Sequence, residues 1–108
     1  MNLFQQKCVP CEVGSVPMKE NEARERLAEI SGWALIDSGA KIEKLFTFAN
    51  FKEAMSFVNK VADIAENEGH HPNIVISYSN VTITIWTHMV GGLTLNDFIL
   101  AAKIDARG

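Results

Sequence analysis

The segment from residue 50 to residue 66 carries the strongest secondary-structure signal in the sequence. Asn50 is a good helix N-cap, and Glu53 follows at the position of its partner in a capping box. Apolar residues recur at helical spacing and form one stripe: Phe51, Ala54, Met55, Val58, Val61, Ala62 and Ala65. We therefore predict an amphipathic helix, with Glu66 at the edge of its buried face. A carboxylate in the last turn opposes the helix dipole, which invites a functional explanation, with a solvated or cation-paired glutamate as the alternative.

Two runs rich in Ile, Val and Thr follow this helix, at residues 73–78 and 81–88. With Ser79-Asn80 as a two-residue loop, they form a hairpin in which one face is predicted to be the core side. The residues on that face pair as Tyr78 with Val81, Ile76 with Ile83 and Ile74 with Ile85. Continuing this register places His71 opposite His88 on the other face, where paired Cβ atoms lie about 4.5–5.5 Å apart. A register slip of one residue would separate these two histidines.

The remaining elements complete the order helix, two strands, helix, two strands, helix. They are helices over residues 20–30 and 94–106 and strands over residues 33–36 and 41–48. Thr94 is interpreted as the N-cap of the last helix, with Asp97 as its capping partner and a substrate contact as the alternative. This order predicts an α+β two-layer sandwich, in which a four-stranded antiparallel sheet carries three helices on one face. The other face, with Thr84 and Trp86, is left for a substrate cleft or a subunit contact.

Length and composition indicate one folded domain, 18–108, preceded by an N-terminal arm, 1–17. The 108 residues are 47% hydrophobic and 21% charged, which argues against disorder. The formal net charge of -3 argues against a nucleic-acid surface. No apolar run approaches the roughly 20 residues of a membrane helix, and the first residues lack a secretory signal. We therefore expect a cytoplasmic protein that binds neither nucleic acid nor membrane.

Cys8 and Cys11 form a Cys-x-x-Cys pair in this arm. A tetrahedral zinc site needs four ligands, and a redox pair of the thioredoxin type should open a helix that follows a strand. The arm provides neither context, so we expect two free thiols on a loosely packed segment. A site shared between subunits, or a metal site completed by a distant histidine, is the alternative.

The three histidines are the best candidates for chemistry: His70, His71 and His88, with Glu66 nearby. An imidazole has an unperturbed pKa of about 6.5, so it can donate and accept protons near neutrality. General acid–base catalysis is therefore the favoured interpretation. A zinc site formed by these four residues is the alternative, although adjacent His70 and His71 point to opposite sides if both are extended.

These residues carry a resemblance to the pterin-4a-carbinolamine dehydratase family, also known as the dimerisation cofactor of a hepatocyte homeodomain factor. The family pattern is an acid, three residues, His-His-Pro, an aromatic residue, Thr-His and an Asp. In this sequence the pattern reads Glu66, His70, His71, Pro72, Tyr78, Thr87, His88 and Asp97. The resemblance extends over residues 32–105, and the Cys-x-x-Cys leader also resembles that of many members. Val13 departs from the glycine often found in that leader.

The resemblance implies a hydro-lyase that removes water from 4a-hydroxytetrahydropterin and yields quinonoid dihydropterin in tetrahydrobiopterin recycling. It implies His70, His71 and His88 as catalytic residues and no metal or cofactor. The residues implied to contact substrate are Glu66, Pro72, Thr87 and Asp97. Family members form homodimers or homotetramers. The alternative function, which the family combines with catalysis in animals, is that of a dimerising adaptor that acts like a transcriptional coactivator.

Overall fold

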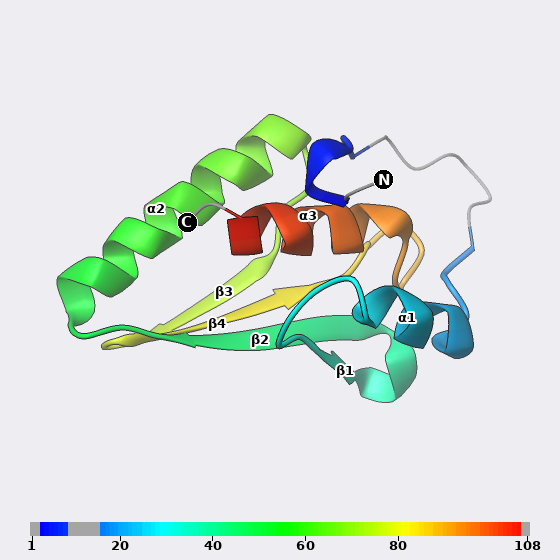
Figure 1. The fold of residues 1–108 in the computed structure, drawn as a ribbon, viewed down its shortest axis with the longest axis horizontal. Helices are drawn as coiled ribbons and strands as arrows, with labels where there is room; N and C mark the ends of the chain where they lie inside the picture. Colours follow the sequence, from blue (N-terminus) through cyan, green and yellow to red (C-terminus); the bar gives the residue numbers. More distant parts are fainter. Residues whose placement is uncertain (1–2, 9–15, 107–108) are drawn as a thin grey trace.

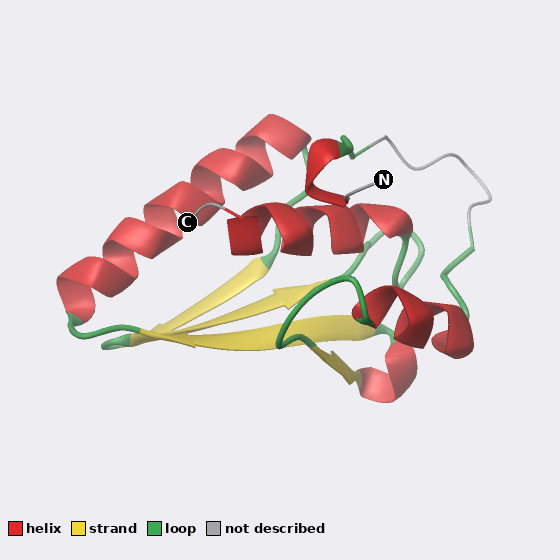
Figure 2. Ribbon diagram, viewed as in Figure 1, coloured by secondary structure: helices red, strands yellow, loops and turns green. Residues whose placement is uncertain are grey.

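The structure is a computed structural model that describes residues 3–8 and 16–106. One antiparallel sheet forms the lower layer of Figure 1, and helices cover one of its faces. Figure 2 shows the same two layers by element type. The predicted α+β two-layer architecture and its element order are therefore confirmed. In the described ranges no helix is both long and apolar enough to cross a bilayer.

The element bounds follow the predicted ones closely, with differences of a few residues at the ends. The elements are η1 (Leu3–Gln5), α1 (Glu20–Leu27), β1 (Ala34–Ile36), η2 (Asp37–Gly39), β2 (Lys41–Thr47), α2 (Phe51–Glu68), β3 (Asn73–Ser77), β4 (Asn80–Ile85) and α3 (Leu95–Ala106). The strand order in the sheet is β1-β2-β4-β3. Strands β1 and β3 are therefore the two edges of the sheet.

The core lies between the sheet and helices α2 and α3. On β4, Val81, Ile83 and Ile85 are fully buried, and Ile42 of β2 pairs with Ile85 in the ladder. Helix α3 is buried along most of its length, and Phe98 is its largest buried side chain. Burying each aliphatic or aromatic side chain contributes about 1.5–3 kcal/mol, so this common core holds α3 in the helix layer over the sheet.

Helix α2 begins as predicted, because the Asn50 side chain accepts a hydrogen bond from the Glu53 N–H at 2.9 Å. Its buried face is narrower than predicted, and consists of Ala54, Phe57, Val61 and Ala65. The prediction was wrong for Phe51, which is 49% exposed, and for Ala62, and it omitted Phe57. Phe57 is buried because its ring packs on Phe46 and Phe48 of the sheet side, at centroid distances of 4.6 and 5.0 Å.

The predicted register of the β3–β4 hairpin is wrong by two residues. Ser77 pairs with Asn80, so the connecting residues are Tyr78 and Ser79 and not Ser79 and Asn80. Tyr78 adopts a left-handed backbone conformation with a φ of 55° to make this turn. Asn80 instead extends β4 and pairs with Thr47 of β2, which lengthens the central ladder.

The shift leaves Val81, Ile83 and Ile85 of β4 on the core face, because strand side chains alternate with a period of two. The prediction of a core position was wrong for Tyr78 and Ile76, which are 69% and 39% exposed. The shift also removes the predicted pairing of His71 with His88. Strand β4 ends at Ile85, and His88 lies beyond it in a turn that the Thr87–Gly92 bridge closes. His71 precedes β3 and is in no ladder either. The histidines therefore approach one another through loops and not across a strand pair.

Candidate active site

Gly69 sets the position of the two adjacent histidines. It ends α2 in a left-handed conformation with a φ of 66°, which a glycine adopts without the steric cost of a Cβ atom. The His70 N–H closes the cap by donating to the Ala65 carbonyl at 3.2 Å. The chain then turns toward β3, and His70 and His71 find separate carboxylate partners.

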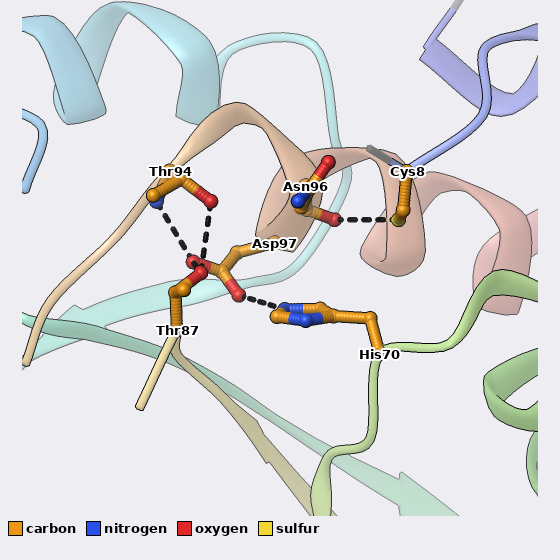
Figure 3. Close-up of polar contacts among 6 residues, drawn as sticks. All are labelled: Cys8, His70, Thr87, Thr94, Asn96 and Asp97. Carbon is orange, nitrogen blue, oxygen red and sulfur yellow. Dashed lines mark hydrogen bonds and ion pairs between the residues drawn. The ribbon is translucent and has the colours of Figure 1, made fainter. Parts of the chain in front are cut away.

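His70 is directed inward and is held by a buried carboxylate. Its side chain is 13% exposed, and Nε2 lies 2.5 Å from Oδ1 of Asp97, which is fully buried on α3. The other oxygen of Asp97 accepts hydrogen bonds from the Thr94 N–H at 2.8 Å and from the Thr87 hydroxyl at 2.9 Å. Figure 3 shows Asp97 between His70 on one side and Thr87 and Thr94 on the other. Asp97 is therefore both the predicted capping residue of α3 and the partner of His70.

The hydrogen bonds to Asp97 account for its burial. A buried carboxylate is costly unless its oxygens are hydrogen-bonded, and both oxygens of Asp97 are. The hydroxyls of Thr87 and Thr94 also bond each other at 2.8 Å, so the group forms a closed network. Such a network fixes the His70 ring in one orientation.

His71 and Glu66 form a second, solvent-exposed pair. His71 Nε2 lies 2.5 Å from Oε2 of Glu66, and the two side chains are 60% and 77% exposed. Exposed ion pairs contribute only about 0–1 kcal/mol, so this contact orients His71 more than it stabilises the fold. The prediction that Glu66 lies near a histidine agrees with this geometry.

His88 reaches the same region from the turn after β4. The Thr87 N–H donates to the Gly92 carbonyl at 2.8 Å, which closes the turn that carries His88. The His88 ring packs against Trp86, with centroids 4.3 Å apart and planes inclined by 42°. Lys41 Nζ lies 4.2 Å from the centroid of the Trp86 ring. Among the described residues, His88 is therefore supported by an aromatic side chain and not by a carboxylate.

One cavity of about 500 Å³ lies among these groups. Its lining residues are Cys8, Glu68, Gly69, His70, His71, Trp86, Thr87, His88, Met89 and Asn96. All three histidines thus reach one cavity, although they come from two loops far apart in the sequence. Its volume falls in the range of about 300–1,000 Å³ typical of small-molecule sites.

Another part of the cavity lining comes from the N-terminal segment and the end of α2, through Cys8 and Glu68. The Cys8 N–H donates to Glu68 Oε1 at 2.9 Å, and Lys103 Nζ lies 3.2 Å from Glu68 Oε2. Burial, with the nearby Glu68 charge, raises the pKa of the Cys8 thiol to about 12. Burial alone would raise the pKa of Glu68, but the Cys8 N–H and the Lys103 ammonium outweigh it and lower that pKa.

Comparison with known proteins identifies the family. The family described as pterin 4 alpha carbinolamine dehydratase matches residues 16–107. The chain belongs to this family. A Vibrio cholerae serotype O1 protein provisionally named pterin-4-alpha-carbinolamine dehydratase is 45% identical over 106 residues, which cover 96% of this chain and 97% of that protein. A Halorhodospira halophila protein with the same provisional name is 44% identical over 108 residues and covers 100% and 99%.

Two solved structures share the fold of this dehydratase family member. A protein from Brucella melitensis, described as a transcriptional coactivator/pterin dehydratase, has a TM-score of 0.79 and 33% identity over 83% of this chain and 96% of its own. A pterin dehydratase-like protein described as a RuBisCO assembly factor in the alpha-carboxysome has a TM-score of 0.61 and 25% identity over 69% and 87%.

The family pattern and the cavity overlap only in part. The three histidines and Thr87 line the cavity, whereas Glu66, Pro72 and Asp97 are not among its lining residues. Asp97 instead contacts His70. Tyr78 is 69% exposed in the hairpin turn, at the end of β3 remote from His70 and His71.

The predicted site residues omit six of the lining residues, namely Cys8, Glu68, Gly69, Trp86, Met89 and Asn96. Trp86 and Met89 flank the Thr-His pair, so their proximity could have been inferred from chain neighbourhood alone. No local pattern brings Cys8 to Glu68, because 60 residues separate them.

The zinc alternative finds no matching geometry in the described ranges 3–8 and 16–106. Within them no three His, Cys, Asp or Glu side chains are grouped so that they could hold a metal ion. His70 and His71 each bind a different carboxylate, and they do not converge on one point. Cys11 lies outside the described residues, so the Cys-x-x-Cys pair is described only through Cys8, whose thiol is free.

Proposed function

We propose that this chain dehydrates 4a-hydroxytetrahydropterin to quinonoid dihydropterin, as a step of tetrahydrobiopterin recycling. Family membership supports a pterin dehydratase. The observation that carries the proposal for this chain is the His70–Asp97 pair, at 2.5 Å, on the wall of a cavity that His71 and His88 also line. A buried, oriented imidazole beside a ligand-sized cavity is the arrangement that general acid–base chemistry requires.

The reaction needs one proton donor and one proton acceptor. The bond between C4a and its hydroxyl oxygen breaks, and a donated proton lets that oxygen leave as water. The N5–H bond also breaks, and its electron pair forms the C4a=N5 double bond of the product. An imidazole can serve at either point near neutral pH, and neither step requires a change of oxidation state.

His70 is best suited to accept the N5 proton. Asp97 accepts hydrogen bonds from Thr87 and Thr94, so the proton shared with His70 belongs on Nε2. His70 Nδ1 is then the nitrogen that takes up a proton, and the Asp97 carboxylate stabilises the imidazolium that forms. The proton for the leaving hydroxyl comes from His71 or His88.

Carbinolamine turnover by the purified protein tests this proposal. We expect the wild type to accelerate dehydration, and His70→Ala, His71→Ala and His88→Ala each to lower kcat by about 10²-fold, a typical contribution of one acid–base group. Tyr78→Phe is the matched control, because Tyr78 lies in the remote turn, and it should keep wild-type kcat. Full turnover by all three histidine variants would overturn the assignment, and stoichiometric zinc in the purified protein would favour the metal alternative.

We also propose that the chain forms a homodimer or homotetramer. The observation that supports this is the edge strand β3, whose outer side pairs with no other strand of residues 3–8 and 16–106. On it Val75 is 60% exposed and Ile76 is 39% exposed. The same surface would serve an adaptor, so an assembled protein with pterin turnover and no bound partner would favour the enzyme over the adaptor.

A further inference from the structure

The N-terminal segment at residues 3–8 packs on the domain and reaches the cavity. Leu3 is only 4% exposed and joins the hydrophobic core, where η1 lies beside α3 (Figure 1). From there the chain leads to Cys8, which lines the cavity together with His70 and Asn96. We propose that residues 3–8 form one wall of the pterin-binding pocket, and that Glu68 and Lys103 are positioning residues that hold this wall in place.

Three groups hold this wall in place: the Cys8 N–H, the Glu68 carboxylate and the Lys103 ammonium. We call their contact the clamp. Glu68, whose side chain is only 7% exposed, accepts the Cys8 N–H with one oxygen and binds the Lys103 ammonium with the other. Glu68 belongs to the last turn of α2 and Lys103 to the last turns of α3. The contact therefore ties the segment to both helices that frame the cavity. This contact also explains why the Glu68 carboxylate lies at the C-terminal end of α2, where the helix dipole disfavours a negative charge.

The Cys8 side chain is the part of the wall that faces the site. Its thiol donates to the Asn96 carbonyl at 3.5 Å, in the first turn of α3 and one residue before Asp97. Figure 3 shows Cys8 and Asn96 on the same side of the site as His70. With a pKa of about 12 the thiol stays protonated near neutral pH, so it acts as a packing and hydrogen-bonding group and not as a nucleophile.

The identity of the ligand in this inference rests on the proposed function. The docking of residues 3–8 on the domain does not. The hydrogen bonds of Cys8 go to Glu68 and Asn96, whereas His70 and His71 bind the carboxylates of Asp97 and Glu66. Loosening the wall should therefore weaken pterin retention and leave the proton transfers in place. We therefore expect a rise in KM with little change in kcat, because the lost contact would have contributed equally to binding of the substrate and of the transition state.

Thiol alkylation tests the docking directly. In a Cys11→Ser background, iodoacetamide should label Cys8 slowly, because the docked thiol is partly buried and protonated. Adding Glu68→Ala should speed labelling about tenfold or more, as expected when a hydrogen bond to a charged group is lost. Glu68→Gln, which keeps an acceptor oxygen but loses the charge, should give a smaller increase. Glu53→Ala, at the other end of α2, is the matched control and should change nothing. Equal labelling rates in all four proteins would overturn the clamp.

Ligand binding tests the wall as part of the pocket. Saturating 7,8-dihydrobiopterin should slow Cys8 labelling about tenfold in the Cys11→Ser protein, and Glu68→Ala should raise KM about tenfold with kcat within about twofold. If calorimetry shows that the pterin binds and yet Cys8 stays unprotected and KM is unchanged, the inference is wrong and the proposed function stands. If no pterin binds while Glu68→Ala still speeds labelling, the proposed function fails and the segment is a wall of a pocket for another ligand.

Discussion

At the scale of single residues, Asp97 connects the fold to the site. As a capping residue it satisfies the Thr94 N–H at the start of α3, and through its other oxygen it binds His70. The capping role requires only a short polar side chain, whereas the role proposed for the contact with His70 requires a charge that stabilises an imidazolium. The two roles can therefore be separated by a substitution that keeps the shape and removes the charge.

We expect Asp97→Asn to fold and to lose turnover. Its amide oxygen can still accept from Thr94 and Thr87, so the free energy of unfolding should fall by only about 1–2 kcal/mol. Its kcat should fall about 10²-fold, because the imidazolium of His70 loses its carboxylate. Urea denaturation and single-turnover rates measure the two effects separately.

The control for this prediction is another helix cap. Asn50→Ala removes the cap of α2 and should cost about 1 kcal/mol with an unchanged kcat. If Asp97→Asn behaves like Asn50→Ala, with a stability loss and full turnover, then Asp97 is a capping residue alone and His70 needs no charged partner.

At the scale of elements, the β3–β4 hairpin shows what strand alternation can and cannot predict. Alternation correctly placed Val81, Ile83 and Ile85 on the core face, since that depends only on whether a position is odd or even. It could not distinguish registers that differ by two residues, because both bury the same row. Turn propensities favoured a loop at Ser79-Asn80. In the structure Asn80 instead pairs with β2, which lengthens that ladder, and Tyr78 in the turn adopts a left-handed backbone conformation.

A substitution of the turn residue Tyr78 should therefore be able to increase the free energy of unfolding. A left-handed conformation costs a residue with a Cβ atom about 1–2 kcal/mol, and glycine avoids that cost but loses about 0.5–1 kcal/mol of chain entropy. Tyr78 is 69% exposed, so little packing is lost. We expect Tyr78→Gly to stabilise the protein by about 0.5 kcal/mol, a rise in Tm of roughly 2–4 °C.

Ser79→Gly provides the comparison, because Ser79 is not among the residues with a positive φ. Glycine there adds only the entropic cost, so this variant should lose about 0.5–1 kcal/mol. Thermal unfolding followed by circular dichroism measures both. A Tyr78→Gly protein as unstable as Ser79→Gly would show that the Tyr78 side chain, or another turn conformation, matters more than backbone strain.

At the scale of the whole molecule, the fold was predictable and much of the site was not. Capping and helical or alternating periodicity are local signals, and they were sufficient for the element order and the two layers. The His70–Asp97 pair joins residues 27 apart, and the Cys8–Glu68 pair joins residues 60 apart. Such contacts depend on how the loops leave α2 and β4 in three dimensions, which periodicity does not encode. The family pattern named His70 and Asp97, but it did not reveal that they bind each other.

The edges of the sheet determine how the whole molecule should assemble. Strand β3, residues 73–77, contains no charged residue and no proline, which are the usual protection of an edge strand. The other edge, β1, is a short strand of 3 residues. Pairing of β3 with its copy about a two-fold axis would continue the antiparallel sheet and satisfy the edge of both chains.

We therefore expect light scattering to report a mass above that of the monomer at micromolar concentration, and Val75→Lys to lower it. Val75 is 60% exposed, so lysine should leave the fold intact, while a two-fold contact would bring the new charges of both copies together. Such repulsion should raise the dissociation constant about tenfold or more. Ala34→Lys places the same charge on exposed Ala34 of β1 and should leave the mass unchanged. A wild type that is monomeric, or an assembly that tolerates lysine at β3 and not at β1, would rule out β3 as the contact between copies.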